Sequence, residues 1–201
     1  MAGSRVTVSS RALAPVVIVT GVLGLVAAIA LLLETIALIS DPSATLVCDI
    51  NPFISCGRSI SSAQGSLLGI PNPILGIIFW SATLAIGVAL AAGSRPARWF
   101  RLGFLAAVTG AFALVVWFIV QSVFVIGVLC PWCMLTWAAT IPLFLMVLLD
   151  SVATGVLPLP VAARRVATAL RGWLPTLTLV SYLLVTVVAQ LRLDLLTLLV
   201  R

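Results

Sequence analysis

Four cysteines form two pairs whose spacing suits thiol–disulfide exchange. Cys48 and Cys56 enclose the seven residues DINPFIS, and Cys130 and Cys133 form a C-P-W-C motif in front of a long apolar run. A C-x-x-C pair cycles between dithiol and disulfide where its surroundings stabilise a thiolate. Two pairs that meet can pass electrons from one to the other. The sequence therefore predicts a relay between thiols in water and an acceptor dissolved in lipid.

The C-P-W-C motif has the features of a helix start. Pro131 suits the first helical position, because its missing N–H costs nothing there and its φ is already helical. Cys130 is then expected near the N-cap and Cys133 in the first turn, where free N–H groups and the helix dipole lower a cysteine pKa. Cys130 would face the aqueous loops. Cys133 would lie about 4 to 5 Å deeper, toward the lipid.

The elements that position these cysteines are transmembrane helices. The 201 residues are 63% hydrophobic and 8% charged, and their mean hydropathy is +1.31, far outside the range of water-soluble proteins. About 20 apolar residues are needed for each crossing, which leaves room for about five helices. The apolar runs cover residues 16–39, 72–92, 102–125, 134–149 and 174–191. We therefore expect an all-α integral membrane protein, with a retained first helix in place of a cleaved signal peptide.

The basic residues, all of which are arginine, predict the orientation. Arginines occur before the first run, between the second and third, and between the fourth and fifth (Arg5, Arg11, Arg95, Arg98, Arg101, Arg164, Arg165 and Arg171). The positive-inside rule makes these segments, and the N-terminus, cytoplasmic. Residues 40–71 and 126–133, with all four cysteines, then face outward. The net charge of +6 is explained by topology and contact with anionic lipid, so a nucleic-acid partner is not expected.

The sequence gives less support to other roles for these cysteines. Four outward cysteines could form two inert structural disulfides, because that compartment is oxidising. A zinc site is disfavoured, since C-x7-C is a poor chelating spacing and the chain has no histidine. The same absence excludes a Ser-His-Asp or Cys-His hydrolase.

Several motifs together resemble the vitamin K epoxide reductase (VKOR) family, in its bacterial disulfide-forming branch. They are the seven-residue spacing of Cys48 and Cys56, Ser62 six positions after Cys56, Asn72 at the head of the second apolar run, and C-P-W-C followed by Thr136-Trp137-Ala138. The resemblance divides the chain into a cytoplasmic segment 1–15, a catalytic domain 16–155 with the outward loop 40–71, and a basic loop with a fifth transmembrane helix, 156–201. It implies a four-helix bundle around a quinone pocket, with the fifth helix beside it.

The resemblance also implies a role for each site residue. Cys133 reacts with the quinone, Cys130 exchanges with the loop pair, and Cys56 and Cys48 are shuttle cysteines, of which Cys48 meets the partner. Ser62 helps to hold the redox centre. Asn72 hydrogen-bonds a quinone carbonyl. Many members place tyrosine, the other hydrogen-bond donor to the quinone, at the position of Trp137; an indole N–H can donate one bond but cannot accept.

The predicted function is reoxidation of a separate, extracytoplasmic thioredoxin-like (DsbA-like) protein in the bacterial cell membrane. Electrons would pass through the two cysteine pairs to menaquinone or ubiquinone, with no metal. A vitamin K or quinone epoxide reductase would use the same cysteines, and a membrane scaffold would hold two static disulfides. A DsbB-like enzyme is disfavoured, because its C-x-x-C lies in the first outward loop.

Three further polar side chains lie near the outer ends of the predicted helices. Glu34 is assigned either a structural role at the interface or a path for protons. Gln121 and Ser122 are expected to make hydrogen bonds between helices.

Overall fold

The structure is a computed structural model that describes residues 4–50 and 53–193, so the ends of the predicted segments 1–15 and 156–201 lie outside the described residues. Five helices in this part are long and apolar enough to cross a membrane. They are α1 (Ser4–Ser40), α3 (Asn72–Ala91), α4 (Arg98–Val120), α5 (Pro131–Ala153) and α7 (Leu174–Leu193). The predicted all-α membrane fold, with five transmembrane helices, is confirmed.

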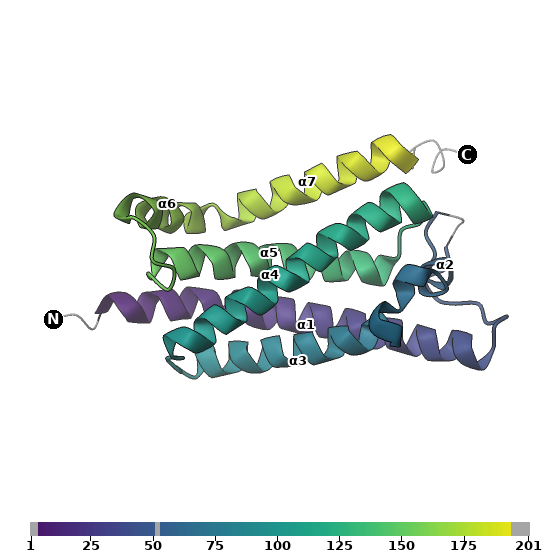
Figure 1. Cartoon of the computed structure of the whole chain (residues 1–201), viewed down its shortest axis with the longest axis horizontal. Helices are drawn as coiled ribbons and strands as arrows, with labels where there is room; N and C mark the ends of the chain where they lie inside the picture. The colour runs from purple at the N-terminus through teal and green to yellow at the C-terminus, as the bar shows by residue number, and fades with distance from the viewer. Residues whose placement is uncertain (1–3, 51–52, 194–201) are drawn as a thin grey trace.

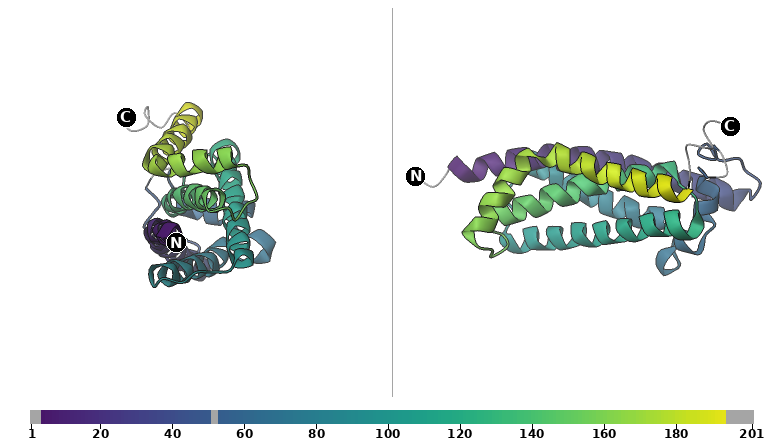
Figure 2. Two further views of the ribbon diagram at one scale, coloured as in Figure 1. Left: turned by 90° about the vertical axis from the view of Figure 1, so that its left-hand side faces the viewer. Right: turned by 90° about the horizontal axis from the view of Figure 1, so that it is seen from above.

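Helix α5 lies at the centre of the bundle and packs against α1, α4, α6 and α7, whereas α3 packs mainly on α1 (Figures 1 and 2). The core between these helices includes Val17 of α1, Trp80 of α3, Val108 of α4 and Leu143 of α5, all at most 2% exposed. The helix that carries the C-P-W-C motif is therefore held by neighbours on several sides.

Helices α1 and α3 approach each other closely at Gly24. A Cβ atom at this position would lie 2.1 Å from the indole ring of Trp80. Small residues allow such close contact between membrane helices, and here glycine leaves the space that the indole fills. Trp80 in turn forms part of the wall of the cavity described below.

Helix α4 ends in a π-helical turn, η3 (Gln121–Ile126). Gly127 follows with a φ of 69°, a left-handed conformation that favours glycine, and its N–H donates to the Ser122 carbonyl at 2.9 Å. The chain then runs extended for three residues to the start of α5. Turns of π-helix occur frequently at functional sites, and this one lies beside the cysteines.

The cysteines and the basic segments lie at opposite ends of the bundle. The short helix α2 (Cys56–Ile60) and the start of α5 are at one end, and α6 (Val161–Gly172) is at the other (Figure 1). The sequence predicted a basic loop after α5, whereas most of it forms α6, which crosses the bundle axis (Figure 2). Its alanines favour helix, and Ala167 is buried.

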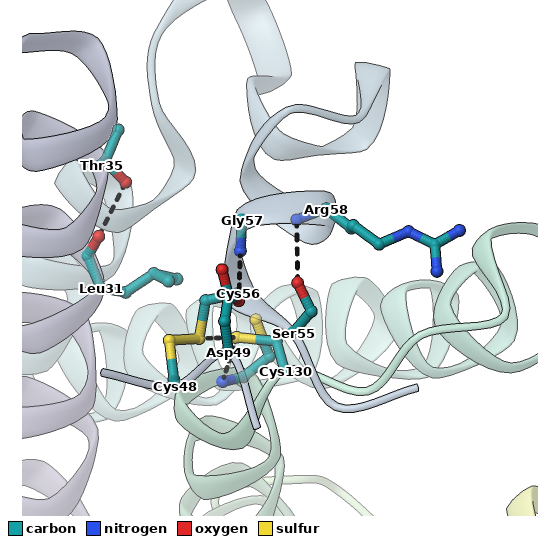
Figure 3. The surroundings of a disulfide bond; sticks show 10 residues. Leu31, Thr35, Cys48, Asp49, Ser55, Cys56, Gly57, Arg58 and Cys130 are labelled. Atoms are coloured by element: carbon teal, nitrogen blue, oxygen red, sulfur yellow. Dashed lines mark hydrogen bonds between the residues drawn. A yellow bond between two sulfur atoms is a disulfide. The ribbon is translucent and has the colours of Figure 1, made fainter. Parts of the chain in front are cut away.

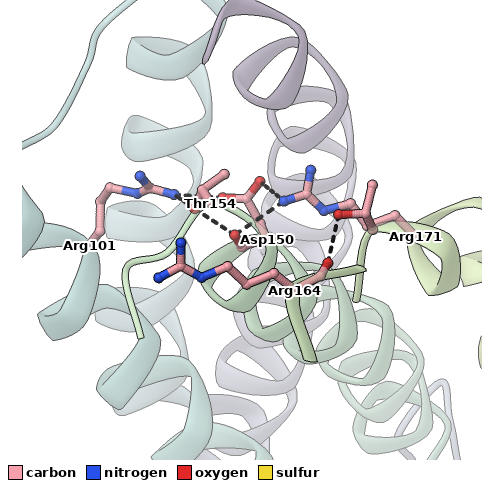
Figure 4. Close-up of polar contacts among 6 residues, drawn as sticks. Arg101, Asp150, Thr154, Arg164 and Arg171 are labelled. Carbon is pink, nitrogen blue, oxygen red and sulfur yellow. Dashed lines mark hydrogen bonds and ion pairs between the residues drawn. The ribbon is translucent and has the colours of Figure 1, made fainter. Parts of the chain in front are cut away.

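Asp150 joins three helices at the arginine-rich end. Its carboxylate is paired with Arg101 of α4 at 2.8 Å and with Arg171 of α6 at 2.9 Å (Figure 4). Arg101 also donates to the Thr154 hydroxyl at 2.6 Å. Asp150 is 3% exposed, so the paired arginines compensate for its burial. The predicted helix covers 134–149 or slightly beyond, and nothing local in the sequence marks Asp150 as the partner of these arginines.

Candidate redox site

The C-P-W-C motif starts α5 in the predicted way. Pro131 is the first helical residue, Cys130 is the N-cap, and the N–H of Cys133 donates to the Cys130 sulfur at 3.4 Å. Both cysteines are free thiols. Cys130 is 1% exposed, whereas Cys133 is partly exposed on the side of α5 that faces the interior of the bundle.

The second pair, Cys48 and Cys56, forms a disulfide in the outer loop. Cys56 is the first residue of α2, which Ser55 caps by accepting a hydrogen bond from the N–H of Arg58 at 3.2 Å. The carboxylate of Asp49 accepts a hydrogen bond from the N–H of Gly57 at 3.1 Å. These bonds fix the loop on both sides of the disulfide.

A short parallel bridge between Ile54 and Leu129 brings the two pairs together. The N–H of Ser55 donates to the Leu129 carbonyl at 3.1 Å, and the N–H of Leu129 donates to the Phe53 carbonyl at 2.8 Å. Each strand segment leads directly into a cysteine that starts a helix. The sulfur of Cys130 therefore lies 3.4 Å from the sulfur of Cys56, within contact distance (Figure 3).

The surroundings of Cys130 lower the pKa of its thiol. The main cause is the hydrogen bond from the Cys133 thiol; burial opposes it, and the backbone N–H groups of Cys133 and Trp132 add to the lowering. Asp49 raises the pKa by charge repulsion, the smallest of these effects. Cys130 is thus a thiolate at a lower pH than an ordinary cysteine, as the sequence predicted for this helix start.

A cavity of about 450 Å³ opens beneath the outer loop. Its walls come from α1, α3, α4 and α5, and the loop from Ser59 to Leu67 roofs it. Most of the wall is aliphatic or aromatic, with a few polar groups: Thr35, Ser59, Gln64, Asn72, Gln121, Ser122, Cys133, Thr136 and Thr140. Its volume and apolar lining are typical of a pocket for a small organic molecule. Of the four cysteines, Cys133 is the one that lines it.

Asn72 lines this cavity and also anchors its roof. Its Oδ1 accepts from the N–H of Leu67 at 2.8 Å, and its Nδ2 donates to the Gln64 carbonyl at 2.6 Å. The carboxamide carries two N–H donors, and the bond to Gln64 uses one of them. Its position is compatible with the predicted bond to a quinone carbonyl, and the loop bonds orient the group.

Trp137 lies one helical turn after Cys133 and also lines the cavity, with 5% of its surface exposed. Ser62 does not line the cavity in the described part of the chain; its hydroxyl donates to the Ser59 carbonyl at 2.7 Å. Ser59 itself lines the cavity, as Cys133 does. Ser59 was not predicted as a site residue, although its place three residues after Cys56 puts both on one face of α2.

Gln121 joins α4 to the roof, because its Oε1 accepts from Nε2 of Gln64 at 3.2 Å. Gln64 was also not singled out from the sequence, where nothing marks it among the small polar residues of the loop. The Ser122 carbonyl accepts from the N–H groups of Gly127 and Val128.

Glu34 is not among the residues that line the cavity. Within residues 4–50 and 53–193, no group of three or more histidine, cysteine or acidic side chains could hold a metal ion.

A family model described as the vitamin K epoxide reductase family matches residues 15–148, which is more than half of the chain. The chain belongs to the vitamin K epoxide reductase family. No curated protein matches it. Membership implies membrane redox chemistry that involves disulfides and a quinone, and the multi-pass helical structure fits this setting.

The cavity of this VKOR family member fits a quinone head group. Such a ring is flat and apolar and carries two carbonyl acceptors, so it needs apolar walls and one or two donors. Trp80 and Phe79 supply aromatic wall, and Asn72 and Trp137 carry N–H donors in the lining. These residues would hold the ring within reach of Cys133.

Proposed function

We propose that this protein is a membrane thiol–disulfide oxidoreductase that reoxidises a separate, extracytoplasmic thioredoxin-like (DsbA-like) protein. It passes the electrons through Cys48–Cys56 and Cys130–Cys133 to a quinone in the membrane. The observation that carries the proposal is the position of the C-P-W-C pair. The sulfur of Cys130 contacts the loop disulfide, and Cys133 lines an apolar cavity.

The exposed fractions of the loop cysteines and their neighbours support entry of the partner's electrons at Cys48. Cys56 is fully buried beside Cys130. Cys48 is 4% exposed, and the chain next to it reaches the surface, with Val47 87% exposed. A thiolate of the partner attacks the Cys48 sulfur, and the S–S bond breaks to release Cys56 as a thiolate. Attack by the partner's second thiol on the mixed disulfide then releases Cys48 and leaves the partner oxidised.

The 3.4 Å contact between Cys56 and Cys130 supports direct transfer between the pairs. The Cys56 thiolate attacks Cys130 in its disulfide with Cys133, and Cys133 leaves as a thiolate. Cys48 then attacks Cys56 to restore the loop disulfide and release Cys130. The loop disulfide and free C-P-W-C thiols seen here correspond to the state after this transfer.

A bound quinone supplies the electron sink, because it takes up two electrons and two protons. Cys133 lies on the cavity wall, while Cys130 stays beside it to reform the disulfide. Asn72 and Trp137 orient the oxidant by hydrogen bonds. The apolar walls exclude water from the thiolate. Menaquinone is the first choice for this oxidant and ubiquinone the second.

The two ends of the bundle support a location for the active site. The cysteines lie at one end and the arginines of α4 and α6 at the other, and with the positive-inside rule this arrangement supports a redox site on the extracytoplasmic face. We assign the protein to the cytoplasmic membrane of a bacterium and to the disulfide-forming branch of its family.

The test is turnover by the purified full-length chain in liposomes. A reduced DsbA-like protein is the donor, and menaquinone or ubiquinone analogues are the acceptors. We expect one quinol for each disulfide formed in the donor. Quinol formation absent with both acceptors would refute the proposal, and turnover only with a quinone epoxide would assign the chain to the epoxide reductases instead. A scaffold with static disulfides predicts no turnover with any acceptor.

A further inference from the structure

Helix α5, which carries the C-P-W-C motif, contains a proline in its interior, Pro142. Proline has no N–H, and its ring crowds the carbonyl four residues earlier, so the carbonyl of Ala138 loses its usual partner within the helix. Water cannot replace that partner in the hydrocarbon region of a membrane. The Ala138 carbonyl therefore needs a donor from a neighbouring helix.

Tyr182 of α7 is that donor. Its hydroxyl donates a hydrogen bond to the Ala138 carbonyl at 2.5 Å, although 44 positions of sequence separate the two residues. Tyr182 is the only tyrosine of the chain, and it is partly buried. Helix α7 thus supplies the hydrogen bond that Pro142 removes from α5.

This bond reaches α5 beside the cavity wall. Trp137, the residue before Ala138, lines the cavity, and Thr140 lines it two residues further along. Trp137 also belongs to a buried apolar cluster that α7 completes with Ala189. Because Trp137 and Ala138 are consecutive, a shift of the bonded carbonyl moves the backbone that carries the indole ring.

A third contact joins the end of α7 to the π-helical turn η3. The guanidinium carbon of Arg192 lies 5.7 Å from the centre of the Phe124 ring, within the range of a cation–π interaction. Together with the bond from Tyr182, this contact fixes α7 at two levels along the bundle. Helix α7 is therefore attached to the elements around the cavity by polar contacts as well as by packing.

We propose that Tyr182 is a positioning residue for the quinone pocket, because its bond to Ala138 fixes the turn of α5 that carries Trp137. This role rests on the proposed function, in which the cavity takes a quinone. Without the hydroxyl, the carbonyl is left without a donor, and α5 shifts at the point where Pro142 interrupts its hydrogen bonds. Trp137 then leaves the position in which the flat ring fits. Within the described part of the chain, Tyr182 does not line the cavity, so it acts through α5.

The test measures binding of menadione, the bare head group of menaquinone, to the purified full-length protein with both cysteine pairs oxidised. Oxidised cysteines cannot reduce the probe, so binding is separated from turnover. Quenching of tryptophan fluorescence gives the dissociation constant, because Trp80 and Trp137 line the cavity.

Four variants are compared with the unmodified protein. Tyr182→Phe removes the hydroxyl and keeps the ring, and Pro142→Ala returns an N–H to α5. The third variant combines these two substitutions. Ser181→Ala is the matched control, because the Ser181 hydroxyl donates within α7 itself, to the Leu177 carbonyl at 2.9 Å.

We expect Tyr182→Phe to raise the dissociation constant of menadione about tenfold, because a buried carbonyl loses its donor. With Pro142→Ala present, the restored N–H satisfies that carbonyl, so adding Tyr182→Phe should change the constant by no more than about twofold. Ser181→Ala should match the unmodified protein. An unchanged constant in Tyr182→Phe would overturn the inference. So would an equal effect of Tyr182→Phe with and without Pro142→Ala, or an equal rise in Ser181→Ala.

Turnover of the unmodified protein with a reduced DsbA-like donor separates this inference from the proposed function. If menadione binds with the expected pattern and no quinone is reduced, the proposed function fails and the role of Tyr182 stands. If quinol forms and Tyr182→Phe binds menadione as tightly as the unmodified protein, the role of Tyr182 fails and the proposed function stands. Absence of menadione binding to the unmodified protein would also overturn the inference.

Discussion

The sulfur of Cys56 lies 3.4 Å from the sulfur of Cys130, although 74 positions of sequence separate the two residues. The contact depends on two backbone hydrogen bonds between residues 53–55 and Leu129. It joins a loop disulfide to the N-cap of a central helix.

Cys133→Ala should trap the transfer step. Without Cys133, the Cys130 thiolate can attack Cys56 in the loop disulfide, and no neighbouring thiol in its motif can reverse the attack. We expect a Cys56–Cys130 disulfide, detected by mass spectrometry of peptides from the unreduced protein, and no quinol formation. A persistent Cys48–Cys56 disulfide in every molecule would contradict the assignment of Cys130 as the exchanging cysteine.

Cys48→Ala should block the protein partner but not a small dithiol. A thioredoxin-like protein needs the loop disulfide, whereas a small dithiol can reduce Cys130–Cys133 directly. Quinol formation should therefore continue with dithiothreitol and fall at least a hundredfold with a DsbA-like donor. If dithiothreitol also fails to drive this variant, the order of electron flow is wrong.

Leu129→Pro should slow transfer between the pairs, because proline removes the N–H that donates to the Phe53 carbonyl. Leu129→Ala keeps that N–H and serves as the control. We expect the rate of exchange between the pairs to fall at least tenfold in Leu129→Pro. This rate is measured by rapid quenching and alkylation of the thiols. The single-turnover reaction of the already reduced C-P-W-C pair should change little. Equal rates in the two variants would show that the bridge does not position the sulfurs.

The lowered pKa of Cys130 predicts how its reactivity depends on pH. A lowered pKa means that the thiolate persists to lower pH than in an ordinary cysteine, and reactivity is lost as the pH falls through that value. Since the hydrogen bond from Cys133 is the main cause, Cys133→Ala should shift the alkylation profile of Cys130 to higher pH. The profile is measured with iodoacetamide on protein freshly reduced at Cys130. An unchanged pH profile would indicate that the backbone N–H groups are the main cause of the lowered pKa of Cys130.

Asp150→Ala should destabilise the arginine-rich end of the bundle. The substitution leaves Arg101 and Arg171 facing each other without their shared carboxylate. Both arginines are partly exposed, so we expect a loss of about 2 kcal/mol in the free energy of unfolding. Thermal unfolding in detergent measures it, with Arg165→Gln, an exposed position on α6, as the control. Equal unfolding temperatures for the two variants would show that the ion pairs do not stabilise the bundle.

Local patterns in the sequence were sufficient for much of the fold. Apolar runs of the length of a bilayer predicted the five membrane helices, because a buried backbone in lipid must satisfy its hydrogen bonds within the helix. Pro131 predicted the start of α5, since its effect on φ and on the N–H is confined to neighbouring residues. The amphipathic α6 was missed because its arginines and alanines were assigned to a loop by charge alone. Asp150 was missed because its partners lie on two other helices.

The sequence by itself determined the set of chemical groups and the helix ends at which they lie. Two cysteine pairs, their predicted common side of the membrane and the N-cap position of Cys130 all follow from residue type and short-range rules. Which sulfurs touch and where the cavity lies were decided by the tertiary structure. Those relationships depend on the bridge between Ile54 and Leu129 and on the packing of α5 among its neighbours. Contacts of this kind join residues far apart in the chain, so no local pattern contains them.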